Sequence, residues 1–203
     1  MKKLIVISVV LLLSFGPAVS NAAKCKWRTD TVNYRTGEPV RWTRWVRNRT
    51  ILRPPYAAIA GVSEGERKFL GLQVIAVEQT LTSRPTKKDL DALLVIPAGS
   101  KLLISMADGL IYELVSTEDV IGDADMKTED DMFSDSGPKA RGDSGYTITA
   151  FGTVKFPLDD DAITALTAQR ASEMRLNANG EEYHFSFGKK PVDKIQKTIL
   201  CIQ

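Results

Sequence analysis

The alternation of apolar and polar positions is clearest near the end of the chain. Residues 146–156 (YTITAFGTVKF) are rich in β-branched and aromatic side chains, which predicts a strand that ends at Pro157. Asp159 stands at the position of a helix N-cap, and the two aspartates after it suit the positive end of a helix dipole. The pattern therefore predicts a short helix from there to about residue 171.

A hairpin and a final helix follow. Asn179-Gly180 separates two short alternating runs, and this pair favours a type I′ turn because both residues tolerate positive φ. From Pro191 to Ile202, apolar residues recur at intervals of three and four while lysines occupy the other face, which predicts an amphipathic helix. The predicted order is strand, helix, hairpin and helix.

A similar order is predicted upstream. Residues 68–81 form an apolar, strand-like run, and Thr86 opens a short helix with the spacing of a capping box. A second hairpin turns at Asp108-Gly109, and one further helical turn is expected to end at Ile121. The two regions are either an internal duplication of a strand-helix-hairpin unit or a chance recurrence of common hairpin patterns. In both cases the fold class is α+β, with an antiparallel sheet and short helices.

Residues 26–49 alternate between polar and large side chains around one turn, which predicts an N-terminal β-hairpin arm. Alternation places Val40, Trp42 and Val46 on one face. The other face is predicted to carry Arg41, Thr43, Trp45, Arg47 and Arg49. Residues 56–67 are expected to connect the arm to the next strand as a short helix or an irregular loop.

Five segments result from this pattern. They are a signal peptide (1–22), a basic aromatic hairpin arm (23–56), a first strand-helix-hairpin unit (57–122), an acidic flexible loop (123–145) and a second strand-helix-hairpin-helix unit (146–203). The loop holds seven acidic and three basic residues and few branched apolar ones. This composition favours a solvated segment without a core of its own.

The first segment has the pattern of a secretory signal peptide. Two lysines precede the apolar run 4–15, which is too short to span a bilayer, and small residues at 20–22 suit cleavage after Ala22 or Ala23. The protein is therefore expected in the periplasm or outside the cell, with no integral membrane span. Without these two lysines the 27 basic residues fall to the number of acidic ones, 25, so net charge does not steer a partner.

Cys25 and Cys201 are the two cysteines of the sequence. In an exported protein, two thiols with no third partner predict a disulfide, which here would tie the arm to the last helix. A redox role is not expected because the closely spaced C-x-x-C pattern is missing.

Basic and aromatic residues interleave in the arm and form the candidate binding site. Guanidinium groups offer paired donors to phosphate or carboxylate, and indole rings offer stacking faces. The site residues are Arg41, Trp42, Arg44, Trp45, Arg47 and Arg49. The pattern favours an envelope polyanion or a protein as partner, and it disfavours nucleic acid in an exported protein. The alternative is an edge hairpin whose arginines prevent edge-to-edge pairing.

Three further motifs give no assignment. The acidic loop resembles a calcium loop, but Lys127 and Thr128 occupy the third ligand and glycine positions, so no metal or cofactor is expected. Arg141-Gly142-Asp143 is the tripeptide of integrin ligands, and a flexible glycine turn explains it as well. Lys189 and Lys190 at a helix start form either an anion site with the helix N–H groups or a solvated pair.

Residues 142–145 (GDSG) resemble the run around the nucleophile of trypsin-like serine proteases. That resemblance implies Ser144 as a nucleophile, which needs a histidine as its base. The one histidine, His184, is expected on the surface of a hairpin strand downstream of the serine, whereas the base of that family lies upstream. No catalytic residue is therefore assigned.

Together these patterns predict a non-catalytic binding module of the bacterial envelope that recognises a protein or a polyanion through the arm. One alternative is a secreted inhibitor or immunity-type protein that uses the acidic loop to mimic an anionic ligand. The other alternative is a hydrolase that draws its acids from the same loop, for which no pair of nucleophile and base can be named.

Overall fold

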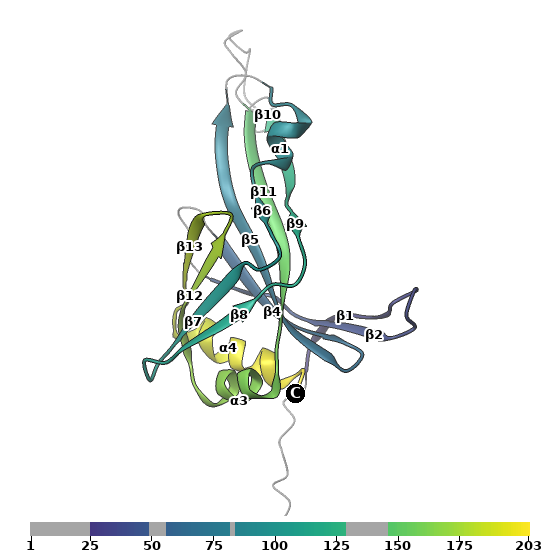
Figure 1. The fold of residues 1–203 in the computed structure, drawn as a ribbon, viewed down its shortest axis with the longest axis vertical. Helices are drawn as coiled ribbons and strands as arrows, with labels where there is room; N and C mark the ends of the chain where they lie inside the picture. The colour runs from purple at the N-terminus through teal and green to yellow at the C-terminus, as the bar shows by residue number, and fades with distance from the viewer. Residues whose placement is uncertain (1–24, 49–55, 82–83, 129–145) are drawn as a thin grey trace, which may run out of the picture.

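The computed structural model describes residues 25–48, 56–81, 84–128 and 146–203 (Figure 1). The described part of the fold is mostly antiparallel sheet with a few short helices. The α+β class is confirmed at this level. None of the described helices combines the length and hydrophobicity that a membrane crossing requires. The predicted segments outside the described residues are the signal peptide (1–22), Arg49 and residues 129–145 of the acidic loop.

The larger sheet has seven strands and is built around one long antiparallel pair. This pair consists of β5 (Arg67–Leu81) and β11 (Tyr146–Pro157), and at about 3.3 Å per residue β5 spans roughly 50 Å. The strand β10 (Asp123–Thr128) lies beside β11, and β4 (Tyr56–Glu64) lies beside β5. Both β2 (Pro39–Thr43) and β3 (Val46–Arg47) pair with β4, and β1 (Trp27–Val32) pairs with β2. Figure 1 shows β1 and β2 projecting sideways from the lower half.

A second antiparallel sheet has four strands. Their order is β13 (Glu181–Ser186), β12 (Ala171–Ala178), β7 (Lys101–Met106) and β8 (Ile111–Val115). Asn179 (φ 50°) and Gly180 (φ 79°) connect β12 to β13, which confirms the predicted turn with two positive φ angles. The hairpin of β7 and β8 also turns where predicted, with Gly109 at φ 90°. Two short strands, β6 (Val95–Ile96) and β9 (Val120–Ile121), pair separately.

Each described helix begins near its sequence signal. In α1 (Lys87–Asp91), Thr86 and Asp89 form the predicted capping box. The helix α3 (Asp160–Ala168) begins after Asp159, whose Oδ1 accepts the N–H of Ala162 at 2.7 Å. The helix α4 (Lys189–Leu200) has Gly188 as its N-cap, so Pro191 lies within the first turn rather than at the first helical position.

One hydrophobic core lies between the two sheets, α3 and α4. It joins Leu72 and Phe156 of the larger sheet, Ile104 of the smaller sheet, Ile163 of α3 and Ile199 of α4, each nearly inaccessible to solvent. In Figure 1, α3 and α4 close the lower end of the molecule, whereas α1 lies at the upper end beside β10. The core therefore fixes the position of α4 relative to the strands near it.

Three segments differ from the sequence prediction. Residues 56–64 form β4 rather than a helix or a loop, because this run of small residues is buried on both faces of the sheet. Residues 120–121 form β9 rather than a helical turn, and Asp119 Oδ1 accepts the N–H of Ala98 at 2.7 Å. The acidic loop begins with the strand β10, because Ala124 and Met126 alternate with exposed aspartates and are half-buried.

The two predicted units, residues 57–122 and 146–203, pair with each other twice, through β5 with β11 and through β7 with β12. Each supplies one strand of the β5 and β11 pair and one hairpin of the smaller sheet, where β7 and β12 are neighbours. The connections differ, since β6 lies between α1 and β7 whereas α3 is followed almost at once by β12. The internal duplication stays a prediction.

A disulfide joins Cys25 to Cys201, with the two Cα atoms 5.6 Å apart and a separation of 176 positions in sequence. Cys25 precedes β1, and Cys201 is the C-cap of α4. The predicted pairing is therefore present. It holds the start of the first hairpin against the end of the last helix.

Candidate ligand-binding groove

The candidate site begins at a bulge between β2 and β3. Trp42 is opposite Val62 on β4, whereas Val46 is opposite Ile59, so one strand has an extra residue in this interval. Such an extra residue reverses the alternation of the side chains that follow it. Thr43 Oγ1 accepts the N–H of Gly61 at 2.9 Å, and this buried hydrogen bond fixes the start of the bulge.

The bulge brings two tryptophans onto one face of the sheet. The ring centroids of Trp42 and Trp45 are 5.5 Å apart. The ring of Trp42 lies over Gly71 of β5, where an added Cβ would be 2.9 Å from it. Val46 points to the opposite face and is buried in the core. The predicted faces are therefore wrong: Trp45 lies with Trp42, and Val46 does not.

The helix α4 lies beside the strand β3, with two adjoining hollows between them. One hollow has a volume of about 410 Å³ and is lined by Trp45 to Asn48 and by Lys190, Pro191 and Lys194. The other has a volume of about 400 Å³ and extends past Arg44 to the disulfide. Both hollows share Trp45, Val46 and Lys194. We call the two together the cationic groove.

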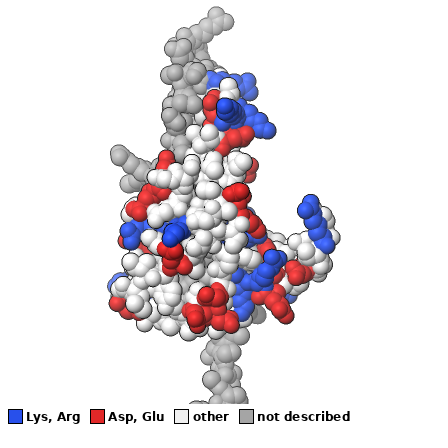
Figure 2. All heavy atoms as spheres, viewed as in Figure 1, with Lys and Arg blue, Asp and Glu red and all other residues white. Residues whose placement is uncertain are grey.

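Six exposed basic side chains line this groove. They are Lys26, Arg44, Arg47, Lys190, Lys194 and Lys197. Within the described part of the chain, none of the six forms an ion pair, and no acidic residue lines either hollow. On the face drawn in Figure 2, by contrast, acidic and basic side chains lie close to one another. The charged side chains that line the groove are therefore all positive, which favours an anionic ligand.

The predicted site residues differ in their relation to the groove. Arg44, Trp45 and Arg47 line it, and Trp42 contacts Trp45. Arg41 does not line it, and its Nε lies 3.0 Å from Asp30 Oδ1. Its guanidinium also lies 5.8 Å from the ring centroid of Trp27. Arg49 lies outside the described residues.

Lys194 and Lys197 of α4 were not among the predicted site residues, whereas Lys190 belongs to the pair for which the sequence left an anion site or a solvated pair open, and it lines the groove. Lys190, Lys194 and Lys197 recur at intervals of four and three residues, so they lie along one side of the helix over roughly 10 Å. The sequence did show that lysines occupy the polar face of this helix. It did not show which strand would lie beside them.

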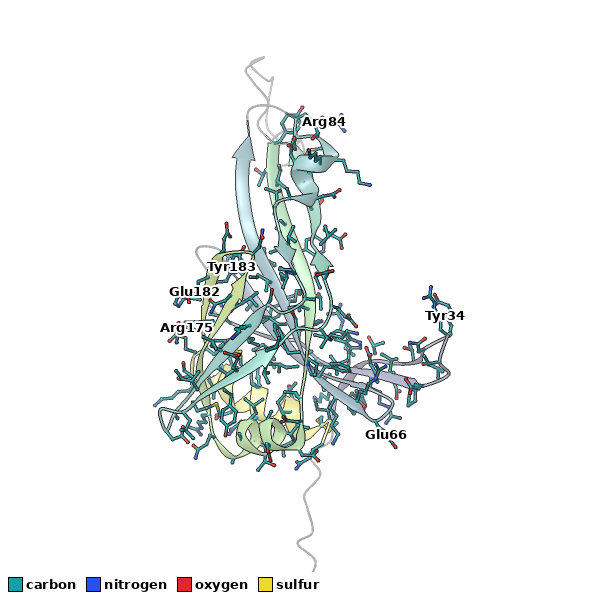
Figure 3. All side chains as sticks on the ribbon, viewed as in Figure 1. Tyr34, Glu66, Arg84, Arg175, Glu182 and Tyr183 are labelled. Atoms are coloured by element: carbon teal, nitrogen blue, oxygen red, sulfur yellow. A yellow bond between two sulfur atoms is a disulfide. The ribbon has the colours of Figure 1, made fainter. Side chains whose placement is uncertain are left out.

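A second polar cluster lies on the exposed face of the smaller sheet. His184 Nδ1 is 3.2 Å from Glu173 Oε1, and its Nε2 contacts Glu182 Oε1. These contacts, Glu173 first, raise the pKa of the imidazole above its ordinary value of 6.5. Figure 3 shows Glu182 and Arg175 on this sheet, and Arg175 is paired with His184 across the strands. Among the described residues, no three histidine, cysteine or acidic side chains are grouped to hold a metal ion.

No protein-family model, curated protein or solved structure matches the chain. The class of the protein is therefore defined by its own fold and site. It is a sheet-rich domain, closed by one disulfide, with a cationic groove between a short strand and the last helix.

Proposed function

We propose that this protein is an exported, non-catalytic binding module that recognises an anionic ligand of the bacterial envelope through the cationic groove. The observation that carries this proposal is the set of six basic side chains around Trp45, none of them paired with an acid among the described residues. The ligand is a polyanion or the acidic surface of a protein.

Physical chemistry supports this choice of ligand. Like charges that line one groove repel one another, and a bound anion relieves that repulsion while releasing the ions that screen it. Arginine adds paired donors for phosphate or carboxylate, and Trp45 adds an apolar surface. A long-range disulfide is typical of oxidising compartments, which agrees with the predicted signal peptide and with a location in the periplasm or outside the cell.

The two alternative functions depend on other residues. The inhibitor or immunity-type protein and the hydrolase would both use the acidic loop, whose residues 129–145 lie outside the described ranges. His184, the one histidine, is engaged by two glutamates on the smaller sheet. The proposal therefore rests on the groove, whose lining residues the structure describes.

The test is a binding titration of the oxidised protein with inorganic polyphosphate at two salt concentrations. The double variant Lys194→Gln with Lys197→Gln removes two charges of the groove. We expect it to lower the affinity about tenfold at low salt, and we expect wild-type affinity to fall between about 50 and 200 mM salt.

A matched control removes the same charge elsewhere. Lys87→Gln with Lys88→Gln alters two lysines of α1, which lies at the opposite end of the molecule from α4 (Figure 1). This control is expected to change the affinity by less than about twofold. Equal losses in the two double variants would show that net charge, rather than the groove, governs binding.

A further inference from the structure

One edge of β3 is left open beside the cationic groove. The strand β1 pairs with β2. The last hydrogen bond between these two segments, on the side of β3, is donated by the N–H of Arg44 to the carbonyl of Lys26 at 3.3 Å. Beyond that point the chain turns at Cys25 to its disulfide with Cys201. Within the described ranges, β3 pairs with β4 and with no other strand.

The backbone of Arg47 points to this open edge. The N–H of Asn48 is donated to the carbonyl of Ala57 at 2.9 Å, and the N–H of Ala57 is donated to the side-chain Oδ1 of Asn48 at 2.9 Å, so Asn48 and Ala57 stand at a hydrogen-bonding position of the ladder. In an antiparallel ladder, hydrogen-bonded pairs alternate with non-hydrogen-bonded pairs. The neighbouring position, Arg47 opposite Ala58, is therefore a non-hydrogen-bonded pair. The N–H and C=O of Arg47 are therefore directed away from β4 and toward the open edge.

Cations flank the open edge on both faces of the sheet. Trp45 and Arg47 project from one face, opposite to that of the buried Val46. On the side of α4, the same hollow is lined by Lys190 and Lys194. A strand added beside β3 would direct its side chains alternately to these two sides.

We propose that the ligand of the groove is an extended, acidic peptide segment of a partner protein, which adds to the edge of β3 as a further strand. Strand addition supplies main-chain hydrogen bonds for affinity, and the side chains that alternate along the segment supply selectivity. Acidic side chains suit both rows of cations, and the Arg47 backbone supplies one donor and one acceptor. This inference rests on the proposed function, because it names the chemistry of the anion bound there.

The test uses an acetylated, amidated peptide of alternating threonine and glutamate, about eight residues long. A second peptide has the same sequence with every backbone N–H methylated, so it keeps the charges and loses the donors. We expect methylation to weaken binding to the oxidised protein by about tenfold or more. Hydrogen exchange of the Arg47 amide is expected to slow in the complex with the first peptide.

A pair of variants examines the same contact from the protein side. Arg47→Gln removes the charge and keeps the N–H, whereas Arg47→Pro removes both, and proline is tolerated where a strand N–H faces the edge. The first peptide is expected to bind Arg47→Pro about tenfold more weakly than Arg47→Gln. Inorganic polyphosphate, which needs no strand edge, is expected to bind the two variants equally and serves as the control for folding.

The outcomes separate this inference from the proposed function. If the methylated peptide binds as tightly as the first one, or if polyphosphate binds and neither peptide does, strand addition is wrong and anion binding stands. If neither polyphosphate nor peptide binds the oxidised protein, both proposals are wrong.

Discussion

Gly61 of β4 lies directly against the backbone of Thr198 in α4. A Cβ atom added at Gly61 would be 2.8 Å from the Thr198 carbonyl oxygen and 3.1 Å from Cγ2 of Ile202. No side chain can stand at this position without moving the helix. Gly61 therefore sets how closely α4, and with it the lysines of the groove, approaches the sheet.

The first prediction concerns this contact. Gly61→Ala is expected to displace α4 and to lower the free energy of unfolding, measured by urea denaturation, by about 1–3 kcal/mol. Gly188→Ala is the control, because no heavy atom lies within 4 Å of a Cβ added there. The control is expected to change the free energy of unfolding by less than about 1 kcal/mol. Equal losses would refute the role of the close approach.

The second prediction concerns the disulfide. Replacing both Cys25 and Cys201 by alanine removes the cross-link without leaving a free thiol, and it frees a loop of 176 residues in the unfolded chain. The expected loss in the free energy of unfolding is about 5 kcal/mol in the chain-entropy description. Urea denaturation of the double variant and the oxidised wild type measures the difference. A loss below about 1 kcal/mol would contradict the expectation.

The third prediction is a pH dependence that arises at His184. Its folded pKa is raised by Glu173 and Glu182, so the protonated form is favoured in the folded protein. The stabilisation is fully present below the unfolded pKa, about 6.5, and is lost as the pH rises through the folded pKa. Because the sequence has one histidine, its NMR titration is unambiguous. A midpoint at or below 6.5 would contradict the prediction.

Glutamine at this position is the matched control. His184→Gln keeps a polar side chain between Glu173 and Glu182 and does not titrate. The free energy of unfolding of the wild type, relative to the variant, is expected to decrease from acid to neutral and alkaline pH. Arg175, which is paired with His184 across the strands, remains in both proteins, so its charge is the same in the comparison.

The fourth prediction concerns the start of α3. Asp159→Ala removes the acceptor of the Ala162 N–H and is expected to lower the free energy of unfolding by about 1 kcal/mol. Asp159→Ser restores a capping oxygen without the charge, and it is expected to recover most of that loss. Thermal or urea unfolding of the three proteins measures the effect, and identical stabilities would refute the cap.

Local signals in the sequence predicted much of the second half of the fold. Asn179-Gly180 fixed its hairpin because few residue pairs accept two positive φ angles, and Asp159 marked the start of α3 because a carboxylate can replace the missing helix acceptor. The residues 56–64 were misread, because small residues carry little local preference and β4 exists through its pairing with β5 and its contact with α4.

The groove was predicted in part for a related reason. Arg44, Trp45 and Arg47 were found from their composition, but the bulge that reverses Val46 and Trp45 depends on pairing with a strand that the sequence did not reveal. The lysines of α4 come from a segment almost 150 residues away in the chain. Their position beside β3 results from the burial of the opposite face of the helix, which is a property of the whole core.

The short distance between Cys25 and Cys201 has a consequence for how the chain can be rearranged. Because their Cα atoms are 5.6 Å apart, a few added residues suffice to connect the end of α4 to the start of β1 through the backbone. New chain ends can then be opened at the exposed Asp108-Gly109 turn, which leaves every strand pairing in place. Such a circularly permuted protein would replace a redox-sensitive link with a permanent one.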